Sequence, residues 1–217
     1  MAGFIFDMDG CLLDSIGAWH TVDSRLCKSA GITLSKEERD ELSSLTLGEA
    51  AEWFHERFGI LESGSEVVQV MIGFLLDFYR TEVVANPGVE AFLQAAHDSG
   101  APMCVLSSSP QSFLQAGLST ADLKRFFDDE LIISAEDRGW AKRKNDTFQK
   151  VCALLGTAPE DTWLFDDSWY AVASAREAGL RTVGVFSANE CGTHEELAQH
   201  SEMVIDDFTE LDPAGFL

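Results

Sequence analysis

The chain has 217 residues, 46% of them hydrophobic and 24% charged, which is the composition of a globular protein with one sizeable core and room for a smaller insert. Fifteen basic residues stand against 37 acidic ones, so the net charge is −22. A surface this negative repels the phosphates of nucleic acid and the anionic headgroups of membranes, and we expect neither as a partner.

The cysteines do not suggest a disulfide framework or a zinc site. They are odd in number, and none of them forms a CxxC pair: Cys11, Cys27, Cys104, Cys152 and Cys191. The longest apolar stretch, VVQVMIGFLLDFY, is too short to span a membrane and carries Gln69 and Asp77. We therefore expect a cytoplasmic protein. We also expect it to be a monomer or a weak homodimer.

The first predicted strand, GFIF at residues 3–6, runs directly into Asp7 and Asp9. No strand is convincing from there to residue 81, where only helical patterns occur. One of these helices begins with Ser35 and Glu38, the spacing of a capping box. This block predicts an inserted all-helical cap domain at residues 15–81, within a core domain formed by residues 1–14 and 82–217.

Strand and helix patterns alternate after this block. Apolar runs predict strands at residues 102–106, 130–133, 162–165, 181–186 and 203–205. These runs are nearly continuous, as in a parallel sheet that is covered on both faces. Two of the intervening helices are predicted to start with an N-cap followed by proline, at Asn86-Pro87 and at Ser109-Pro110. The predicted fold class is α/β, a Rossmann-like, doubly wound parallel sheet with the helical cap inserted.

Polar and charged residues follow several of these strands. The first strand ends in Asp7-Met8-Asp9, the second in serines 107–109, and the fourth in Asp166-Asp167, with the basic run 142–144 before the fourth. In a parallel sheet the ligand site lies beyond the carboxyl ends of the strands. Clustered carboxylates favour a hard divalent cation, and a helix N-terminus favours an anion. Together with a lysine, these are the groups that phosphoryl transfer requires.

The stretch DMDGCLLDS resembles the first motif of the haloacid dehalogenase superfamily, DxDG[TV]xxDS. Ser107, Lys142 and the pair Asp166-Asp167 fall where the second, third and fourth motifs of that superfamily belong. The resemblance covers nearly the whole chain and includes the helical cap. The chain is also similar to beta-phosphoglucomutase-like members and to phosphatases with this type of cap.

The resemblance implies a role for each of these residues. Asp7 would attack phosphorus and form an aspartyl-phosphate, and Asp9 would protonate the leaving alcohol and later take a proton from water. Mg²⁺ would be held by the Asp7 carboxylate, the Asp9 backbone carbonyl and Asp167, with Asp166 bound directly or through water. Ser107 would hold a phosphoryl oxygen, and Lys142 would offset negative charge.

Candidate contacts to the substrate, expected to be a small phosphorylated metabolite, are Ser108, Ser109 and Trp19. Core packing is the other interpretation of Trp19.

Two positions depart from the family pattern. Cys11 stands where threonine or valine is usual, and a thiol is a poorer hydrogen-bond partner than a hydroxyl. The third motif reads KRKND in place of a KPxPD-like run. Lys142 lies four residues before Asp146, as that pattern requires, and Lys144 is its rival.

Other activities stay open at this point. A sugar-phosphate mutase of the beta-phosphoglucomutase type is the main alternative to a Mg²⁺-dependent phosphatase, but Leu47 stands where such mutases carry an arginine. Asp9 argues against a dehalogenase, because a halide leaves without protonation. A phosphonate hydrolase would need a reactive lysine in the cap, where only Lys28 and Lys36 are available. The last alternative is a phosphate-binding protein without turnover.

Overall fold

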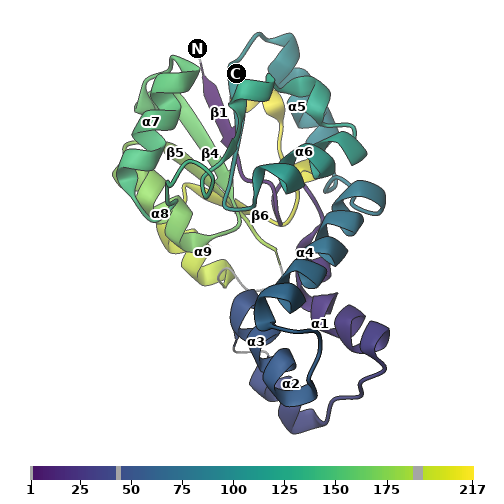
Figure 1. Ribbon diagram of the computed structural model, residues 1–217. Coiled ribbons are helices and arrows are strands. Elements are labelled where there is room, and N and C mark those ends of the chain that lie inside the picture. The colour runs from purple at the N-terminus through teal and green to yellow at the C-terminus, as the bar shows by residue number, and fades with distance from the viewer. Residues whose placement is uncertain (1, 43–44, 188–192) are drawn as a thin grey trace. The chain divides into compact units, whose positions relative to one another are not determined.

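The computed structural model describes residues 2–42, 45–187 and 193–217. The chain divides into two compact units, a core unit of residues 1–16 with 83–217 and a helical unit of residues 17–82. The division that the sequence predicts, at 14/15 and 81/82, stays a prediction. Helices and strands follow one another along the chain as labelled in Figure 1.

Six strands form the sheet of the core unit: β1 (Gly3–Phe6), β2 (Met103–Ser107), β3 (Ile132–Ser134), β4 (Thr162–Asp166), β5 (Arg181–Val185) and β6 (Met203–Ile205). All their pairings are parallel, and the strand order is β3-β2-β1-β4-β5-β6. The chain builds the sheet outward from β1 in both directions. The point where the order reverses, next to β1, is the usual ligand site of such sheets.

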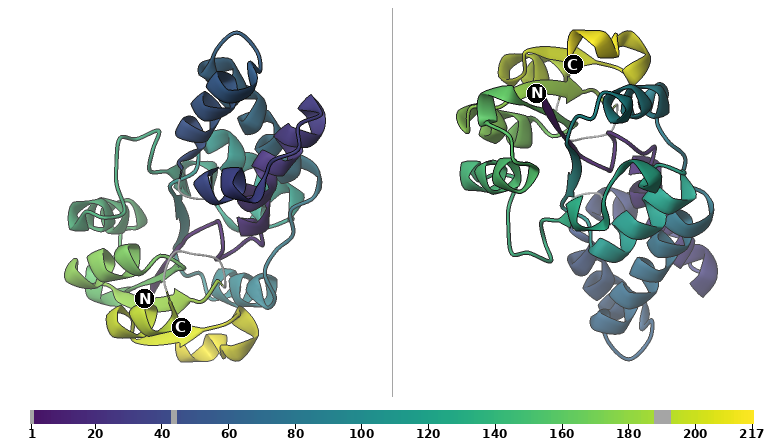
Figure 2. Two further views of the ribbon diagram at one scale, coloured as in Figure 1. Left: turned by 90° about the horizontal axis from the view of Figure 1, so that it is seen from below. Right: turned by 90° about the horizontal axis from the view of Figure 1, so that it is seen from above.

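Side chains along β1 and β4 alternate between the two faces of the sheet, which explains the two buried layers of the core unit. Ile5 and Leu164 point to one face of the sheet, where they pack with Phe148 of α7 (Asn145–Leu155) and with α8 (Trp169–Glu177). On the other face, an aromatic cluster joins strand residues to α5 (Val89–Asp98) and to the C-terminal segment: Phe4, Phe6, Phe92, Phe165, Phe208 and Phe216. Helices thus cover both faces of the sheet (Figure 2), which explains why its strands are almost uniformly apolar.

The core unit also contains the helices α6 (Gln111–Thr120) and α9 (His194–His200). The described residues of the inserted segment form four helices, α1 (Ile16–Ala30), α2 (Lys36–Leu42), α3 (Leu47–Phe58) and α4 (Gly64–Thr81). The predicted fold class, a parallel α/β sheet with an all-helical insertion between its first two strands, is therefore confirmed.

Within the helical unit, α3 and α4 pack closely and are capped by their own sequence. Thr46 and Glu49 form a capping box at the start of α3, and Ser63 accepts from the Glu66 N–H at the start of α4. The predicted box of Ser35 and Glu38 is also present, at the start of α2.

Two predicted N-caps are wrong. The helix α5 begins after Gly88, whose φ of 79° is left-handed, and the Asn86 side chain donates instead to the Cys11 carbonyl at 2.8 Å. The helix α6 begins after Pro110, and the hydroxyl of Ser109 is bonded elsewhere. In both cases the side chain that was expected to cap the helix forms a hydrogen bond with a residue far away in the sequence instead.

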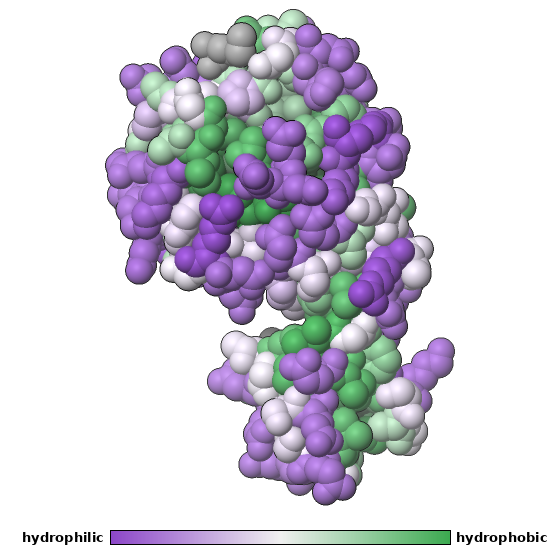
Figure 3. Space-filling model, turned by 45° about the horizontal axis from the view of Figure 1, so that its top comes forward, coloured by the Kyte–Doolittle hydropathy of each residue, from purple (hydrophilic) through white to green (hydrophobic). Residues whose placement is uncertain are grey.

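Hydrophilic side chains make up most of the core-unit surface visible in Figure 3, where they surround a hydrophobic area. Within the described ranges, no helix combines the length and the apolar character needed to cross a bilayer.

Candidate active site

Asp7 follows the last residue of the central strand β1 and is held by the neighbouring strand. Its N–H donates to the Phe165 carbonyl at 2.8 Å, and only 5% of the residue is exposed. The chain then turns, because the N–H of Leu13 donates to the carbonyl of Met8 at 2.9 Å. At the turn, Gly10 has a φ of 76°, and a Cβ there would overlap Asp167. Only glycine fits this position without strain.

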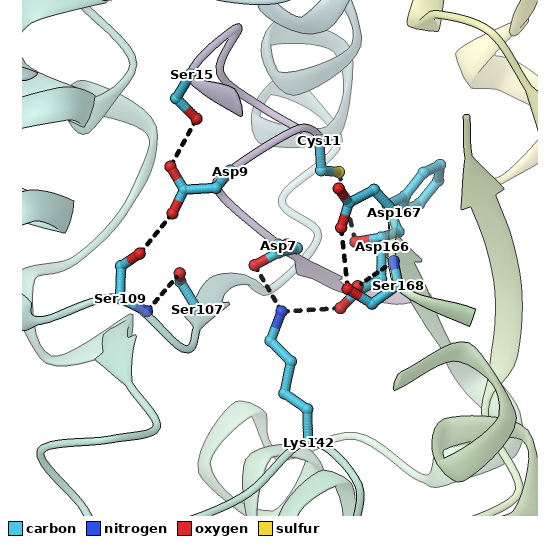
Figure 4. A network of polar contacts seen from close by, with 11 residues as sticks. Asp7, Asp9, Cys11, Ser15, Ser107, Ser109, Lys142, Asp166, Asp167 and Ser168 are labelled. Atoms are coloured by element: carbon cyan, nitrogen blue, oxygen red, sulfur yellow. Dashed lines mark hydrogen bonds and ion pairs between the residues drawn. The ribbon is translucent and has the colours of Figure 1, made fainter. Parts of the chain in front are cut away.

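The turn separates the two aspartates that an extended chain would have directed to the same side. Asp7 points toward Lys142, whereas Asp9 points toward Ser15 and Ser109 (Figure 4). The structure thus brings Asp7 and Asp9 to one end of the sheet but gives their carboxylates different partners.

Lys142 is buried between two carboxylates. Its Nζ lies 2.5 Å from Asp7 Oδ1 and 2.9 Å from Asp166 Oδ2, and 4% of the residue is exposed. The loop that carries it is tied to α7, because the hydroxyl of Thr147 donates to the Ala141 carbonyl at 2.8 Å. Its rival Lys144 is exposed and directly precedes α7. Lys142 is thus the lysine that joins the ends of β1 and β4.

Asp166 and Asp167 lie at the end of β4, where Ser168 orients both of them. The Ser168 N–H donates to Asp166 Oδ1 at 2.9 Å, and its hydroxyl donates to Asp167 Oδ1 at 3.1 Å. All three residues are buried, with 5% exposure or less. The side chains of this cluster therefore have fixed orientations around Lys142.

The charge in this cluster is not balanced by the protein alone. Burial raises the pKa of Asp7 well above its ordinary value, and the nearby Asp166 and Asp167 raise it further although Lys142 opposes them. Burial and the adjacent Asp166 raise the pKa of Asp167 to about 7. Burial by itself would lower the pKa of Lys142, but Asp166 and Asp7 outweigh it and raise that pKa, so the lysine stays charged.

A divalent cation fits this arrangement. Oxygens of Asp7, Asp166 and Asp167 all lie within 4.8 Å of one another, and all three residues are buried. An all-oxygen set of carboxylates suits a hard cation such as Mg²⁺. A bound cation would supply the positive charge that the single ammonium of Lys142 does not. The cluster can therefore bind a metal ion; the Asp9 carboxylate is not part of it.

The serines after β2 take different positions. Ser107 is buried, and its Oγ accepts a hydrogen bond from the Ser109 N–H at 3.1 Å. Ser108 is exposed. Ser109 is 9% exposed, and its hydroxyl donates to Asp9 Oδ2 at 2.6 Å. The substrate contacts of Ser108 and Ser109 stay predictions.

The remaining candidates lie apart from this cluster or pack beside it. Trp19 belongs to the helical unit, where its indole N–H donates to the Tyr79 hydroxyl at 2.9 Å; its substrate contact stays a prediction. Cys11 is fully buried, and its thiol contacts the Phe165 carbonyl at 3.4 Å. Burial, reinforced by the Asp7 charge, raises the pKa of this thiol, which keeps it neutral.

Two residues of the site were not among the predicted catalytic, substrate or metal residues. Ser15, fully buried, donates to Asp9 Oδ1 at 2.6 Å, and Ser168 orients both acidic residues before it. Each position lies within or beside a motif quoted from the sequence, so sequence reasoning could have singled it out. The hydrogen-bond partner was not, because it depends on how the turn at Gly10 folds back.

Comparison with known proteins agrees with this geometry. A family model described as haloacid dehalogenase-like hydrolase matches residues 4–185. Hexitol phosphatase B of Escherichia coli strain K12 is 27% identical over 186 residues, covering 83% of this chain and 82% of its own. The 6-phosphogluconate phosphatase of the same strain is 26% identical over 176 residues, covering 81% and 78%.

Among solved structures, a HAD family hydrolase from Deinococcus radiodurans with bound phosphate and sodium superposes with a TM-score of 0.76. The two chains are 21% identical, and the match covers 100% of this chain and 97% of the other, so it supports the fold. The match of the family model to most of the chain goes further: this chain belongs to the haloacid dehalogenase-like hydrolases.

Proposed function

We propose that this hydrolase is a Mg²⁺-dependent phosphatase that cleaves a small phosphorylated metabolite through an aspartyl-phosphate on Asp7. The observation that carries the proposal is the position of Lys142, whose Nζ is bonded to both Asp7 and Asp166 inside a cluster of three buried carboxylates. A carboxylate that attacks a phosphate ester meets strong negative charge, which buried positive charge must offset.

Asp7 is the proposed nucleophile because it directly follows the central strand and its Oδ1 is held by Lys142. Its other oxygen would attack phosphorus, forming an O–P bond while the bond from phosphorus to the ester oxygen breaks. Asp9 would give its proton to that departing oxygen. It would then take a proton from the water that cleaves the aspartyl-phosphate and releases inorganic phosphate.

Mg²⁺ would be held by Asp7, Asp167 and the Asp9 backbone carbonyl, with Asp166 bound directly or through water. When bound, it would neutralise charge on the phosphoryl oxygens. Ser107, which is buried at the end of β2, would offer its hydroxyl to a phosphoryl oxygen.

The relatives guide the proposal for the substrate. Their names include hexitol phosphatase, 6-phosphogluconate phosphatase and phosphorylated carbohydrates phosphatase. We therefore infer a phosphorylated sugar, sugar acid or sugar alcohol as the substrate of this enzyme. The leaving group would then be an alcohol, which must be protonated as it departs.

The first experiment compares the purified protein and two variants on 4-nitrophenyl phosphate. With Mg²⁺ the protein should hydrolyse this ester, and removing the metal with a chelator should abolish hydrolysis reversibly. Asp7→Asn should lower kcat/KM by about 10⁴-fold or more, because the nucleophile is lost. Asp161→Asn, at an exposed carboxylate outside the site, is the matched control and should have no effect.

A panel of phosphorylated sugars and sugar alcohols, ranked by kcat/KM, then names the substrate. Activity that survives Asp7→Asn would exclude the nucleophile assignment. Isomerisation of a hexose phosphate in place of phosphate release would identify a mutase. Tight binding of Mg²⁺ and phosphate esters without turnover would identify a binding protein.

A further inference from the structure

Both oxygens of the Asp9 carboxylate receive a short hydrogen bond from a serine hydroxyl. Ser15 donates to Oδ1 and Ser109 donates to Oδ2, each at 2.6 Å (Figure 4). Ser109 is 100 residues away in the chain, so this contact joins the turn after β1 to the segment after β2. Short O–H···O⁻ bonds of this length are among the stronger ones in proteins.

The hydroxyl of Ser109 is itself held in place. The Ser109 N–H donates to Ser107 Oγ at 3.1 Å, and the next residue, Pro110, has a fixed φ of −57° where α6 begins. Only 9% of Ser109 is exposed. The side chain therefore approaches Asp9 from a rigid segment, which also carries the serine proposed to bind phosphate.

We propose that Ser109 is a positioning residue, which acts through Asp9 and not as a ligand of the substrate, with Ser15 as the second donor. This inference rests on the proposed function, in which Asp9 protonates the leaving group. A serine hydroxyl can donate to a carboxylate and can accept from a carboxylic acid. The same two serines can therefore hold the Asp9 side chain before and after it transfers its proton.

The expected consequence depends on the leaving group. As the Asp7–phosphorus bond forms and the ester bond breaks, the proton of Asp9 moves to the departing oxygen. A poor leaving group needs that proton, whereas 4-nitrophenolate departs readily without it. A misplaced Asp9 should therefore slow poor leaving groups and spare good ones, which loss of a substrate contact or general loosening of the fold would not do.

The experiment measures kcat/KM for aryl phosphates whose phenols range from 4-nitrophenol to unsubstituted phenol. The ratio kcat/KM reports the step in which the leaving group departs; cleavage of the aspartyl-phosphate is the same for all these esters. Ser109→Ala should lower kcat/KM by about 10- to 100-fold for phenyl phosphate, and by about threefold or less for 4-nitrophenyl phosphate.

Three further variants make the result specific. Ser109→Thr keeps a hydroxyl and should restore the wild-type ratio between the two esters. Ser112→Ala, at an exposed serine of α6, is the matched control and should change neither ester. In an Asp9→Asn background, Ser109→Ala should cause no additional loss, because the residue through which it acts is gone.

An equal loss on both esters, or an additional loss in the Asp9→Asn background, would overturn the inference. If Ser109→Ala does not fold, Ser15→Ala carries the same comparison, since it removes the other hydroxyl. Failure of the proposed function gives a different result: the wild-type protein then hydrolyses none of the esters.

Discussion

Lys142 is the residue on which the charge balance of the site depends. It is a buried ammonium between Asp7 and Asp166, and Asp167 completes a cluster of three carboxylates. Removing one partner of a buried ionic group leaves uncompensated charge behind, which typically costs about 3–5 kcal/mol. Lys142→Met should therefore lower the free energy of unfolding by roughly this amount and abolish phosphatase activity, as urea denaturation and kcat/KM measurements would reveal.

Lys144 provides the control, because it is a lysine two residues away that lies exposed. Lys144→Met should change the free energy of unfolding by about 0.5 kcal/mol or less, and should leave activity nearly unchanged. A larger effect of Lys144→Met than of Lys142→Met would show that Lys144, and not Lys142, is the lysine of the third motif.

Gly10 permits the close approach of the turn after β1 to Asp167. Its φ is 76°, and a Cβ would overlap the carboxylate of Asp167. Gly10→Ala should therefore displace a proposed metal ligand, weakening Mg²⁺ binding and lowering kcat/KM by about 100-fold. The apparent Mg²⁺ affinity, measured from the activation of hydrolysis, tests this.

Gly100 separates the steric effect from the conformational one. It has nearly the same φ, 75°, but a Cβ there would meet nothing within 4 Å. Gly100→Ala should cost about 1 kcal/mol of stability for the left-handed conformation and leave the Mg²⁺ response intact. If the two variants respond to Mg²⁺ alike, close packing at Gly10 does not position the metal site.

At the scale of elements, the strands could be predicted from the sequence because their signal is local. The run GFIF matches β1, and the other five apolar runs agree with β2 to β6 within about two residues. The strand order, with β1 between β2 and β4, could not be read from these runs. It depends on which strands pair in space.

The candidate site, too, could be predicted from the sequence only in part. The motifs predicted which residues gather at the end of the sheet, since carboxyl ends of parallel strands meet at one edge. They did not predict the partners of Asp9, because these depend on a turn and on a contact that spans 100 residues. Asn86 was misassigned for the same reason: its side chain bonds to the carbonyl of Cys11, far away in sequence.

Helices α3 and α4 offer a prediction about packing between elements. At Gly64, the first residue of α4, a Cβ would lie 2.8 Å from the backbone Cα of Glu52 on α3. Gly64→Ala should therefore push the helices apart and lower the melting temperature. Gly73, in the middle of α4, has open space around it, so Gly73→Ala should raise stability by up to about 1 kcal/mol through helix propensity. Thermal unfolding should show a lower melting temperature for Gly64→Ala and a higher one for Gly73→Ala. A higher melting temperature for both variants would contradict the close contact at Gly64.

At the scale of the whole molecule, the chain carries a net charge of −22, and ionising the buried acidic cluster adds to the self-repulsion of the folded state. Asp167, with a pKa raised to about 7 by burial and by Asp166, binds its proton more tightly in the folded chain than in the unfolded one. The pKa of Asp7 is raised in the same direction. Without a metal, the free energy of unfolding should therefore fall as the pH rises from about 4 to about 7.

Mg²⁺ should reverse this dependence, because it binds the ionised carboxylates and competes with protons for them. The rise in melting temperature on adding saturating Mg²⁺ should be small near pH 5 and should grow to a plateau above about pH 7, where Asp167 has lost its proton. Thermal unfolding with chelator and with Mg²⁺ across this range measures both curves. Asp167→Asn is the internal test: it should make the metal-free protein more stable at high pH and remove most of the Mg²⁺ effect. A Mg²⁺ shift that is independent of pH, or greatest in acid, would show that the ion binds elsewhere than at these carboxylates.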